Sequence, residues 1–202
     1  MKLSLRRQAL LELDAPVVME AHGGWGKLYG NCYSSFPGVV FEKQPLKAAY
    51  LAMQRPTWAV YEANCDRAIR EGAGNHLTVN FLDLDPYGEP WPVLSAFLES
   101  DRILPPKLVI VVNDGLRKSL KMGTGWRAKS LEAICQKYGN QFLYDNYLGV
   151  CKEMVNDRAI AAGYEMTKWT AYFCGHLDTM SHYAAVLEMS VVSGEKATRK
   201  VV

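Results

Sequence analysis

The sequence lacks the features that mark disulfide scaffolds, structural zinc sites and membrane spans. Its five cysteines are odd in number and widely spaced, and no two of them form a Cys-x-x-Cys pair. The four histidines show no ligand-like spacing with them. No apolar run approaches the roughly 18 residues that a membrane span needs. We therefore expect no metal site, no membrane segment and a reducing, cytoplasmic location.

A strong charge bias and a targeting segment are also missing. The net charge of +2 is too small to indicate a nucleic-acid partner by itself. The first 13 residues carry Lys2, Arg6 and Arg7 among scattered leucines, without the continuous apolar core or the small-residue cleavage site of a signal peptide. No repeat or linker interrupts the chain, so residues 1–202 are expected to form one domain with a full core.

Short apolar runs alternate with helix-like segments along the chain, which is the pattern of a parallel sheet with crossover helices. The run Lys107–Asn113 (KLVIVVN) is continuously apolar, as expected of a strand buried on both faces. The last two strand-like runs are adjacent, which favours an antiparallel hairpin. These patterns predict an α/β, Rossmann-like fold, with a mostly parallel seven-stranded sheet, helices on both faces and a C-terminal antiparallel β-hairpin. The predicted strands are Pro16–Glu20, Gly38–Phe41, Thr57–Glu62, His76–Leu84, Lys107–Asn113, Tyr164–Cys174 and His182–Val192, and the predicted helices are Pro45–Gln54, Asp66–Glu71, Pro92–Glu99, Trp126–Lys137 and Asn146–Ala162.

The turn Asp85-Pro86-Tyr87-Gly88 follows the fourth predicted strand. In an open α/β sheet, ligands bind at the carboxyl ends of the strands. The motif suits a flat base with an exocyclic amine, because an aromatic ring can stack on the base while a carboxylate and a backbone carbonyl accept the amine hydrogens. An ordinary turn with a core tyrosine is the alternative interpretation.

A glycine-rich turn follows the first predicted strand, from Glu20 through Gly24 and Gly26 to Gly30. Its glycine spacing differs from the dinucleotide fingerprint, which argues against a nucleotide-linked dehydrogenase. The acidic residue would repel a pyrophosphate but would hold the ammonium group of an amino-acid-like cofactor. A purely structural turn is the alternative.

Acidic residues also follow the second and third predicted strands. Glu42 lies 22 residues after Glu20, close to the spacing at which an acid binds ribose hydroxyls. Asp66 is placed to accept a hydrogen bond from an adenine amine. The alternatives are a solvated charge for Glu42 and a helix cap for Asp66.

This order of motifs resembles the class I S-adenosylmethionine-dependent methyltransferases. Their pattern places an acid with glycines after strand one, acids after strands two and three, a catalytic motif after strand four and a reversed hairpin at the end. Within that group, LDLDPYG at Leu82–Gly88 looks most like the tRNA guanine-N2 dimethyltransferases and is similar to the Asp-Pro-Pro-Tyr motif of nucleic-acid amine methyltransferases. The loop His22-Gly23-Gly24-Trp25-Gly26 departs from the family pattern.

The resemblance implies S-adenosylmethionine as cofactor and a nucleic acid as partner, RNA rather than DNA. It implies that Asp85, Pro86 and Tyr87 are catalytic, with Tyr87 also stacking on the base. The implied cofactor-binding residues are Glu20, His22, Gly24, Gly26, Glu42, Lys43, Cys65, Asp66 and Asp85.

A basic segment follows the fifth predicted strand. Asn113, Arg117, Lys118 and Trp126 are expected to form a phosphate-binding and stacking surface for substrate, with a solvated helix face as the alternative. Three further alternatives remain open: methylation of a protein or small molecule, a non-catalytic subunit that kept the fold, and association as a homo-oligomer or with a partner subunit that recognises the target.

Overall fold

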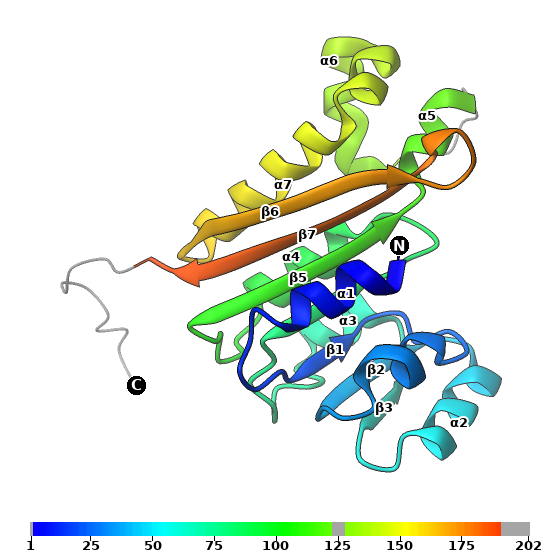
Figure 1. Cartoon of the computed structure of the whole chain (residues 1–202), viewed down its shortest axis with the longest axis vertical. Helices are drawn as coiled ribbons and strands as arrows, with labels where there is room; N and C mark the ends of the chain where they lie inside the picture. The colour runs from blue at the N-terminus through cyan, green and yellow to red at the C-terminus, as the bar shows by residue number, and fades with distance from the viewer. Residues whose placement is uncertain (1, 123–127, 191–202) are drawn as a thin grey trace.

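Seven β-strands form one mixed sheet in the order β3-β2-β1-β4-β5-β7-β6 (Figure 1). The computed structural model describes residues 2–122 and 128–190. Strands β1 to β5 run parallel, whereas β7 is antiparallel to both β5 and β6. The predicted mostly parallel sheet with a reversed C-terminal hairpin is therefore confirmed. The strands are β1 Val18–Glu20, β2 Gly38–Glu42, β3 Ala59–Glu62, β4 Phe81–Leu84, β5 Lys107–Asp114, β6 Tyr164–Cys174 and β7 Met180–Met189.

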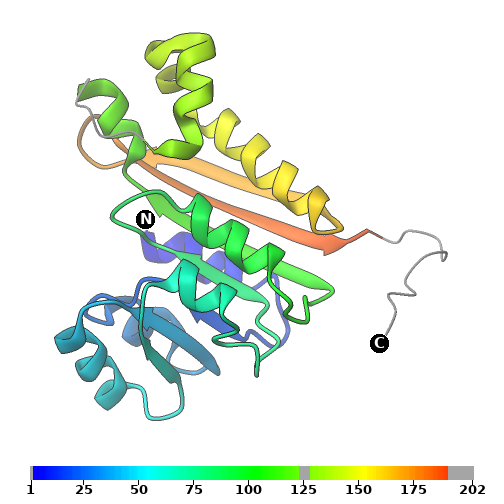
Figure 2. The same ribbon diagram turned by 180° about the vertical axis from the view of Figure 1, so that it is seen from behind.

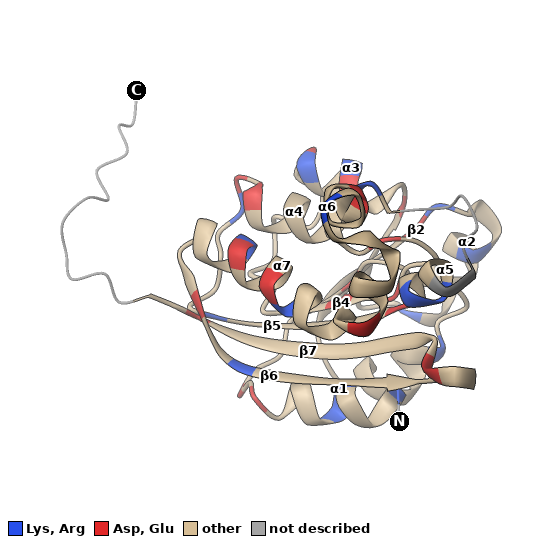
Figure 3. Ribbon diagram, turned by 90° about the horizontal axis from the view of Figure 1, so that it is seen from above, with Lys and Arg blue, Asp and Glu red and all other residues tan. Residues whose placement is uncertain are grey.

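Helices cover both faces of the sheet, as predicted. Helices α3, α4 and α7 lie on the face seen in Figure 2, and α1 and α2 pack on the opposite face. Seen from above, the β6–β7 hairpin lies between α1 and α7, and acidic and basic residues are interspersed over the helices (Figure 3). None of the helices within the described ranges has the length and apolar character needed to cross a membrane. The helices are α1 Lys2–Leu10, α2 Pro45–Gln54, α3 Cys65–Arg70, α4 Trp91–Glu99, α5 Leu116–Met122, α6 Lys129–Asp145 and α7 Tyr147–Ala161, with short turns η1 Tyr29–Tyr33 and η2 His176–Asp178.

The two faces bury separate apolar clusters, and the central strand β5 supplies both. Leu108, Ile110 and Val112 belong to the cluster under α4 and α7, whereas Val109 and Val111 belong to the cluster under α1. Successive residues of a strand point to opposite faces. A strand covered on both faces therefore reads as an unbroken apolar run, which is why the sequence identifies β5 clearly.

The fourth strand is shorter than predicted. The expected strand His76–Leu84 is regular only over Phe81–Leu84. Gly72 and Gly74, just ahead of the expected strand, adopt positive φ values of 91° and 81° in a run of turns that reaches His76. The neighbouring strand β1 has only three residues, so only a few residues of the expected strand can pair with it.

The C-terminal half differs from the prediction mainly at element ends. The helix expected over Trp126–Lys137 is observed as α6, which continues to Asp145 across a break at Gly139 (φ 85°, ψ 162°). The break separates two helical pieces. A helical period that starts in the first piece does not continue into the second, so the sequence pattern predicts only the first. Helix α5 was not predicted, and residues 126–127 and 191–192 of the expected elements lie outside the described ranges.

Helix α1 is the largest departure, because the sequence pattern does not predict it. Leu5 and Leu10 pack against the sheet, but so does Arg6, whose side chain is fully buried. Arg6 donates from Nε and Nη2 to the two oxygens of Asp83 at 2.8 and 2.6 Å, and the Tyr33 hydroxyl donates to the same carboxylate at 2.6 Å. A buried charge is tolerated when it is paired in this way. A reading of polarity alone assigns Arg6 to solvent and so misses the buried face of the helix.

A second buried carboxylate, Asp114, ties the reversed hairpin to the parallel part of the sheet. It accepts hydrogen bonds from the hydroxyls of Tyr147 on α7 and Tyr183 on β7, at 3.0 and 2.9 Å, and from the backbone N–H of Leu116. Burial raises the pKa of Asp114 to about 6 in spite of these three donors.

Asp114→Asn is expected to remove a pH dependence of stability. The raised pKa means that the folded state binds the proton more tightly than the unfolded chain does, so the contribution of Asp114 is full below about pH 4 and is lost as pH rises through about 6. The free energy of unfolding of the wild type, minus that of the variant, should fall by on the order of 2 to 3 kcal/mol between about pH 4 and pH 7. Urea denaturation at both pH values measures this difference, and a value that stays constant or rises with pH contradicts the expectation.

Candidate functional site

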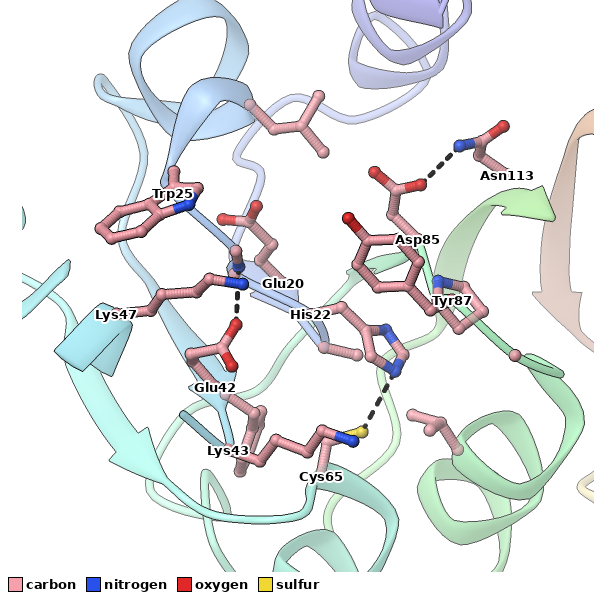
Figure 4. A pocket seen from close by; sticks show the side chains of 18 of the residues that line it. Glu20, His22, Trp25, Glu42, Lys43, Lys47, Cys65, Asp85, Tyr87 and Asn113 are labelled. Atoms are coloured by element: carbon pink, nitrogen blue, oxygen red, sulfur yellow. Dashed lines mark hydrogen bonds between the residues drawn. The ribbon is translucent and has the colours of Figure 1, made fainter. Parts of the chain in front are cut away.

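A cavity of about 850 Å³ opens at the carboxyl ends of the parallel strands β1, β2, β4 and β5. The loops after these strands and the start of α3 bring their side chains into it (Figure 4). This edge is where open α/β sheets bind ligands. The structure brings together most of the predicted site residues here, namely Glu20, His22, Gly24, Glu42, Lys43, Cys65, Asp66, Asp85, Pro86, Tyr87 and Asn113.

Glu20, the last residue of β1, is buried and is paired with a cation that the sequence did not suggest. Arg55, at the end of α2, donates from Nη1 to Glu20 Oε2 at 2.6 Å. The other oxygen, Oε1, is buried and has no hydrogen-bond partner among the described residues. Burial raises the pKa of Glu20, and the Arg55 guanidinium opposes that shift. The carboxylate therefore has one acceptor oxygen left at the cavity wall.

The glycine loop after β1 needs its glycines for backbone reasons. Gly24 and Gly26 adopt positive φ values of 52° and 73°, a region that side chains disfavour. A Cβ on Gly23 would lie 2.5 Å from the side chain of Leu51, so α2 packs directly on this backbone. Gly24 lines the cavity, whereas Gly26 closes the turn by donating to the Gly23 carbonyl and is not among the lining residues.

Glu42, at the end of β2, connects the glycine loop to the start of α2. Its Oε2 accepts the backbone N–H of Gly24, and its Oε1 accepts the backbone N–H of Gln44, both at 2.9 Å. Each oxygen keeps a further lone pair for a ligand. Glu42 is thus held in place by the backbone at the cavity wall.

The first turn of α3 contributes the next two lining residues. The helix is capped by Asn64, whose side chain accepts the backbone N–H of Arg67 at 3.3 Å. Asp66 is therefore not the N-cap, and its side chain lines the cavity instead. Cys65 places its Sγ 3.6 Å from the Nε2 of His22, and burial raises the pKa of this thiol to about 12, so it stays protonated.

Asp85 lies at the opposite wall, where two polar groups hold its carboxylate. The amide nitrogen of Asn113, on β5, donates to Oδ1, and the ammonium of Lys2, on α1, pairs with Oδ2. Asn113 is buried, lines the cavity and holds Asp85 through its amide nitrogen, and its predicted contact with substrate stays a prediction. The Tyr87 ring beside it is fully exposed, so both of its faces are open to a planar ligand (Figure 4).

The predicted basic surface after β5 is not assembled as expected. Arg117 is buried, with its guanidinium 3.8 Å from the ring centroids of both Tyr144 and Phe173. It donates to the backbone carbonyls of Tyr144 and Asp178, so it joins α5, α6 and the hairpin and is not available to phosphate. Lys118 is exposed but does not line the cavity. Trp126 lies outside the described residues.

Several lining residues were missed from the sequence. Trp25, on the glycine loop, is half exposed, meets Tyr50 edge-on with ring centroids 5.7 Å apart and lies under the Lys47 ammonium. The position of Trp25 between the turn glycines Gly24 and Gly26 is a sequence feature that could have predicted this part of the cavity wall. Helix α1 could have been predicted from Lys2 and Arg6, which lie one helical turn apart among leucines. The lining residues that were not predicted include Lys2, Leu3, Trp25, Lys27, Leu28, Asn31, Lys47 and Glu89.

Comparisons with known proteins identify the fold. A scan against protein-family models and a search of curated proteins found no match to this sequence. Among solved structures, the chain is similar to M. jannaschii TYW2 in complex with AdoMet (15% identity, TM-score 0.58, covering 94% of this chain and 76% of that chain). It is also similar to the cyclopropane synthase MmaA2 from Mycobacterium tuberculosis (12% identity, TM-score 0.55, 92% and 83%) and to the plantazolicin methyltransferase BpumL in complex with SAH (10% identity, TM-score 0.57, 94% and 82%). The chain therefore has the Rossmann-like fold that these proteins share.

Proposed function

We propose that the protein is an S-adenosylmethionine-dependent methyltransferase that acts on an exocyclic amine of a nucleic-acid base, in the manner of a tRNA guanine methyltransferase. The observation that carries the proposal is the convergence of Glu20, Glu42, Asp66 and Asp85 on one cavity. The likeness in fold to structures that hold AdoMet or SAH supports the choice of cofactor.

The cavity fits such a cofactor in size and in the kind of polar group that it presents. A volume of about 850 Å³ is within the range of small-molecule sites. The unpartnered Oε1 of Glu20 is an acceptor for an ammonium group. Gly24 lines the wall and carries no side chain, so its backbone can lie close to a ligand.

Each wall of the cavity then has a distinct task. Glu20 holds the amino group of the cofactor, Glu42 accepts the ribose hydroxyls, and Asp66 accepts the adenine amine. His22, Lys43 and Cys65 complete the cofactor wall in this proposal. When bound, S-adenosylmethionine supplies a methyl group already activated on a sulfonium, so the protein has mainly to align it with the nucleophile.

The wall formed by Asp85, Pro86 and Tyr87 is assigned to the substrate. Asp85 and the Pro86 carbonyl accept hydrogen bonds from the target amine and so orient its lone pair. Tyr87 stacks on the base with its exposed ring. Asn113 and Lys2 fix the Asp85 carboxylate, and a carboxylate held in one position loses little freedom when it binds the amine.

An amine on a protein or small molecule is the second candidate substrate. It gains weight because Arg117 is buried between two rings, which removes one of the expected phosphate contacts. Transfer of a labelled methyl group to unfractionated tRNA, to DNA and to cell extract distinguishes the two candidates.

The cofactor assignment is tested by thermal unfolding with and without S-adenosylmethionine or its demethylated product. A ligand present at about 100 times its Kd stabilises the folded state by about 2.7 kcal/mol. For a protein of this size that corresponds to a rise in Tm of roughly 5 to 10 °C. A Tm that neither compound changes, at concentrations up to millimolar, contradicts the proposed function.

Glu42→Ala is expected to weaken cofactor binding by roughly 10- to 100-fold, because it removes the acceptor for two ribose hydroxyls, each worth about 1 kcal/mol, and frees the glycine loop. Titration calorimetry measures the affinity. Glu62→Ala is the matched control, since Glu62 ends the neighbouring strand β3 in register with Glu42 but is exposed and outside the cavity. Equal affinities for the two variants would refute the role of Glu42.

A further inference from the structure

We propose that His22 accepts the proton that the substrate amine loses during methyl transfer, which makes it a catalytic residue and gives it a task beyond holding the cofactor. This inference rests on the proposed function. In that reaction the amine nitrogen forms a bond to the methyl carbon, the carbon–sulfur bond breaks with its electron pair passing to sulfur, and the methylated nitrogen releases one proton. The structure indicates where that proton goes.

Asp85 is poorly suited to take the proton, although it is the residue nearest to the proposed amine position. Its two oxygens are engaged, one by the Asn113 amide and the other by the Lys2 ammonium. With both oxygens held in this way, Asp85 is placed to orient the amine.

The other carboxylates that line the cavity have protein partners, and the proposed function assigns the remaining oxygens of Glu20 and Glu42 to the cofactor. Glu20 is paired with Arg55, Glu42 holds two backbone N–H groups, and Glu89 accepts two hydrogen bonds from Ser130. Asp66 lies on α3, where the proposed function places the adenine amine. The proton acceptor is therefore to be sought elsewhere in the wall.

His22 has the position and the unpartnered ring nitrogen that a proton acceptor needs. Its imidazole lies between Cys65, on the cofactor side, and the turn formed by Asp85 and Tyr87, on the substrate side (Figure 4). Nε2 contacts the Cys65 thiol at 3.6 Å, whereas Nδ1 is buried and has no hydrogen-bond partner among the described residues. A buried ring nitrogen without a partner is costly unless a ligand or substrate satisfies it.

The charge state of the ring suits the same task. Burial lowers the pKa of His22 from its ordinary value, and the surrounding carboxylates Asp85, Asp83, Glu42 and Asp66 oppose this shift, Asp85 most strongly. The imidazole is therefore neutral at pH 7 and can take a proton, and the nearby carboxylates stabilise the imidazolium that results. For Nδ1 to carry the free lone pair, Nε2 must carry the hydrogen and donate it to the Cys65 sulfur.

The first test reads the tautomer directly and does not require catalysis. Nitrogen-15 NMR of the protein alone at pH 7 should show His22 with a protonated Nε2 and an unprotonated Nδ1. Protonation on Nδ1 overturns the proposal, because that nitrogen could then not accept a proton.

The second test uses His22→Gln, with His76→Gln as the matched control, since His76 is exposed and outside the cavity. Methyl transfer from labelled S-adenosylmethionine to unfractionated tRNA should fall about 10²- to 10⁴-fold in kcat for His22→Gln. The acidic limb of the pH profile of kcat, measured at saturating S-adenosylmethionine, should disappear. A variant that loses cofactor affinity but keeps the wild-type kcat at saturation overturns the proposal.

The failure of this inference can be told apart from the failure of the proposed function. A wild type whose Tm does not respond to S-adenosylmethionine contradicts the proposed function. A wild type that binds the cofactor and methylates, together with a His22→Gln variant of equal kcat, contradicts only the assignment of His22. The tautomer measurement decides the inference even if His22→Gln does not fold.

Discussion

Asp85→Ala is expected to lower the rate of methyl transfer by on the order of 10²-fold, while the affinity for S-adenosylmethionine changes less than about threefold. The carboxylate lies at the wall assigned to the substrate, and its two partners come from α1 and β5, neither of which carries a residue assigned to the cofactor. Its loss therefore removes the acceptor that orients the amine and leaves the proposed contacts of the cofactor intact. Single-turnover measurements with bound cofactor would separate the methyl-transfer step from binding.

Two further variants make this expectation sharper. Asp85→Asn keeps one acceptor oxygen in place but removes the charge, so its rate should lie between those of the wild type and Asp85→Ala. Asp101→Ala is the control for a lost aspartate, because Asp101 is exposed between α4 and β5 and does not line the cavity. A parallel loss of cofactor affinity and transfer rate in Asp85→Ala would assign Asp85 to the cofactor and contradict the proposed division of the cavity.

The fold was predictable because it depends on patterns that are local in the sequence. The unbroken apolar run of β5, the turn residues after each strand and the adjacency of β6 and β7 each indicate their own element. The strand-end residues were predictable for a related reason. Carboxyl ends of parallel strands meet at one edge of a sheet, so Glu20, Glu42 and Asp85 had to lie near one another once the strand order was known.

The partners of these residues could not be predicted, because they are distant in the sequence and belong to different elements. Lys2 and Asp85 are 83 positions apart, and Glu20 and Arg55 are 35 positions apart. For Arg117, the local sequence led to a wrong prediction. Its neighbours in the sequence suggested an exposed basic surface, but its position in the fold lies between aromatic rings from α6 and β6. Whether a cation is paired and buried is decided by packing, and no local pattern records it.

Arg6→Met is expected to destabilise the protein by about 3 to 5 kcal/mol, the largest effect on stability that we predict for a single replacement. Both Arg6 and Asp83 have side chains with no accessible surface, and the Tyr33 hydroxyl is the other side-chain donor to that carboxylate. Removing the guanidinium leaves a buried carboxylate without its counter-charge. Urea denaturation measures the loss as a fall in the free energy of unfolding.

A double-mutant cycle tells whether the loss comes from the uncompensated charge or from lost packing. Asp83→Leu alone leaves Arg6 buried and unpaired, so it should also cost about 3 to 5 kcal/mol, whereas Arg6→Met combined with Asp83→Leu removes both charges and should cost clearly less than either single change. Arg70→Met is the surface control, because Arg70 pairs with Glu99 in an exposed salt bridge at 3.2 Å, and such pairs contribute at most about 1 kcal/mol. Additive losses in the double variant would show that the pair is not energetically coupled.

The same double variant tests whether the ion pair is connected to the cavity. Helix α1 carries Lys2 to the Asp85 carboxylate, and Arg6 fixes that helix one turn further along. If Arg6 and Asp83 serve stability alone, the double variant should regain both its Tm and its rate of methyl transfer. If the pair also fixes the position of Lys2, the double variant should regain its Tm but keep a rate reduced by about 3- to 10-fold, an effect of about 1 kcal/mol. We expect the second result, because a hydrophobic pair restores packing without the directional hydrogen bonds that set the orientation of α1.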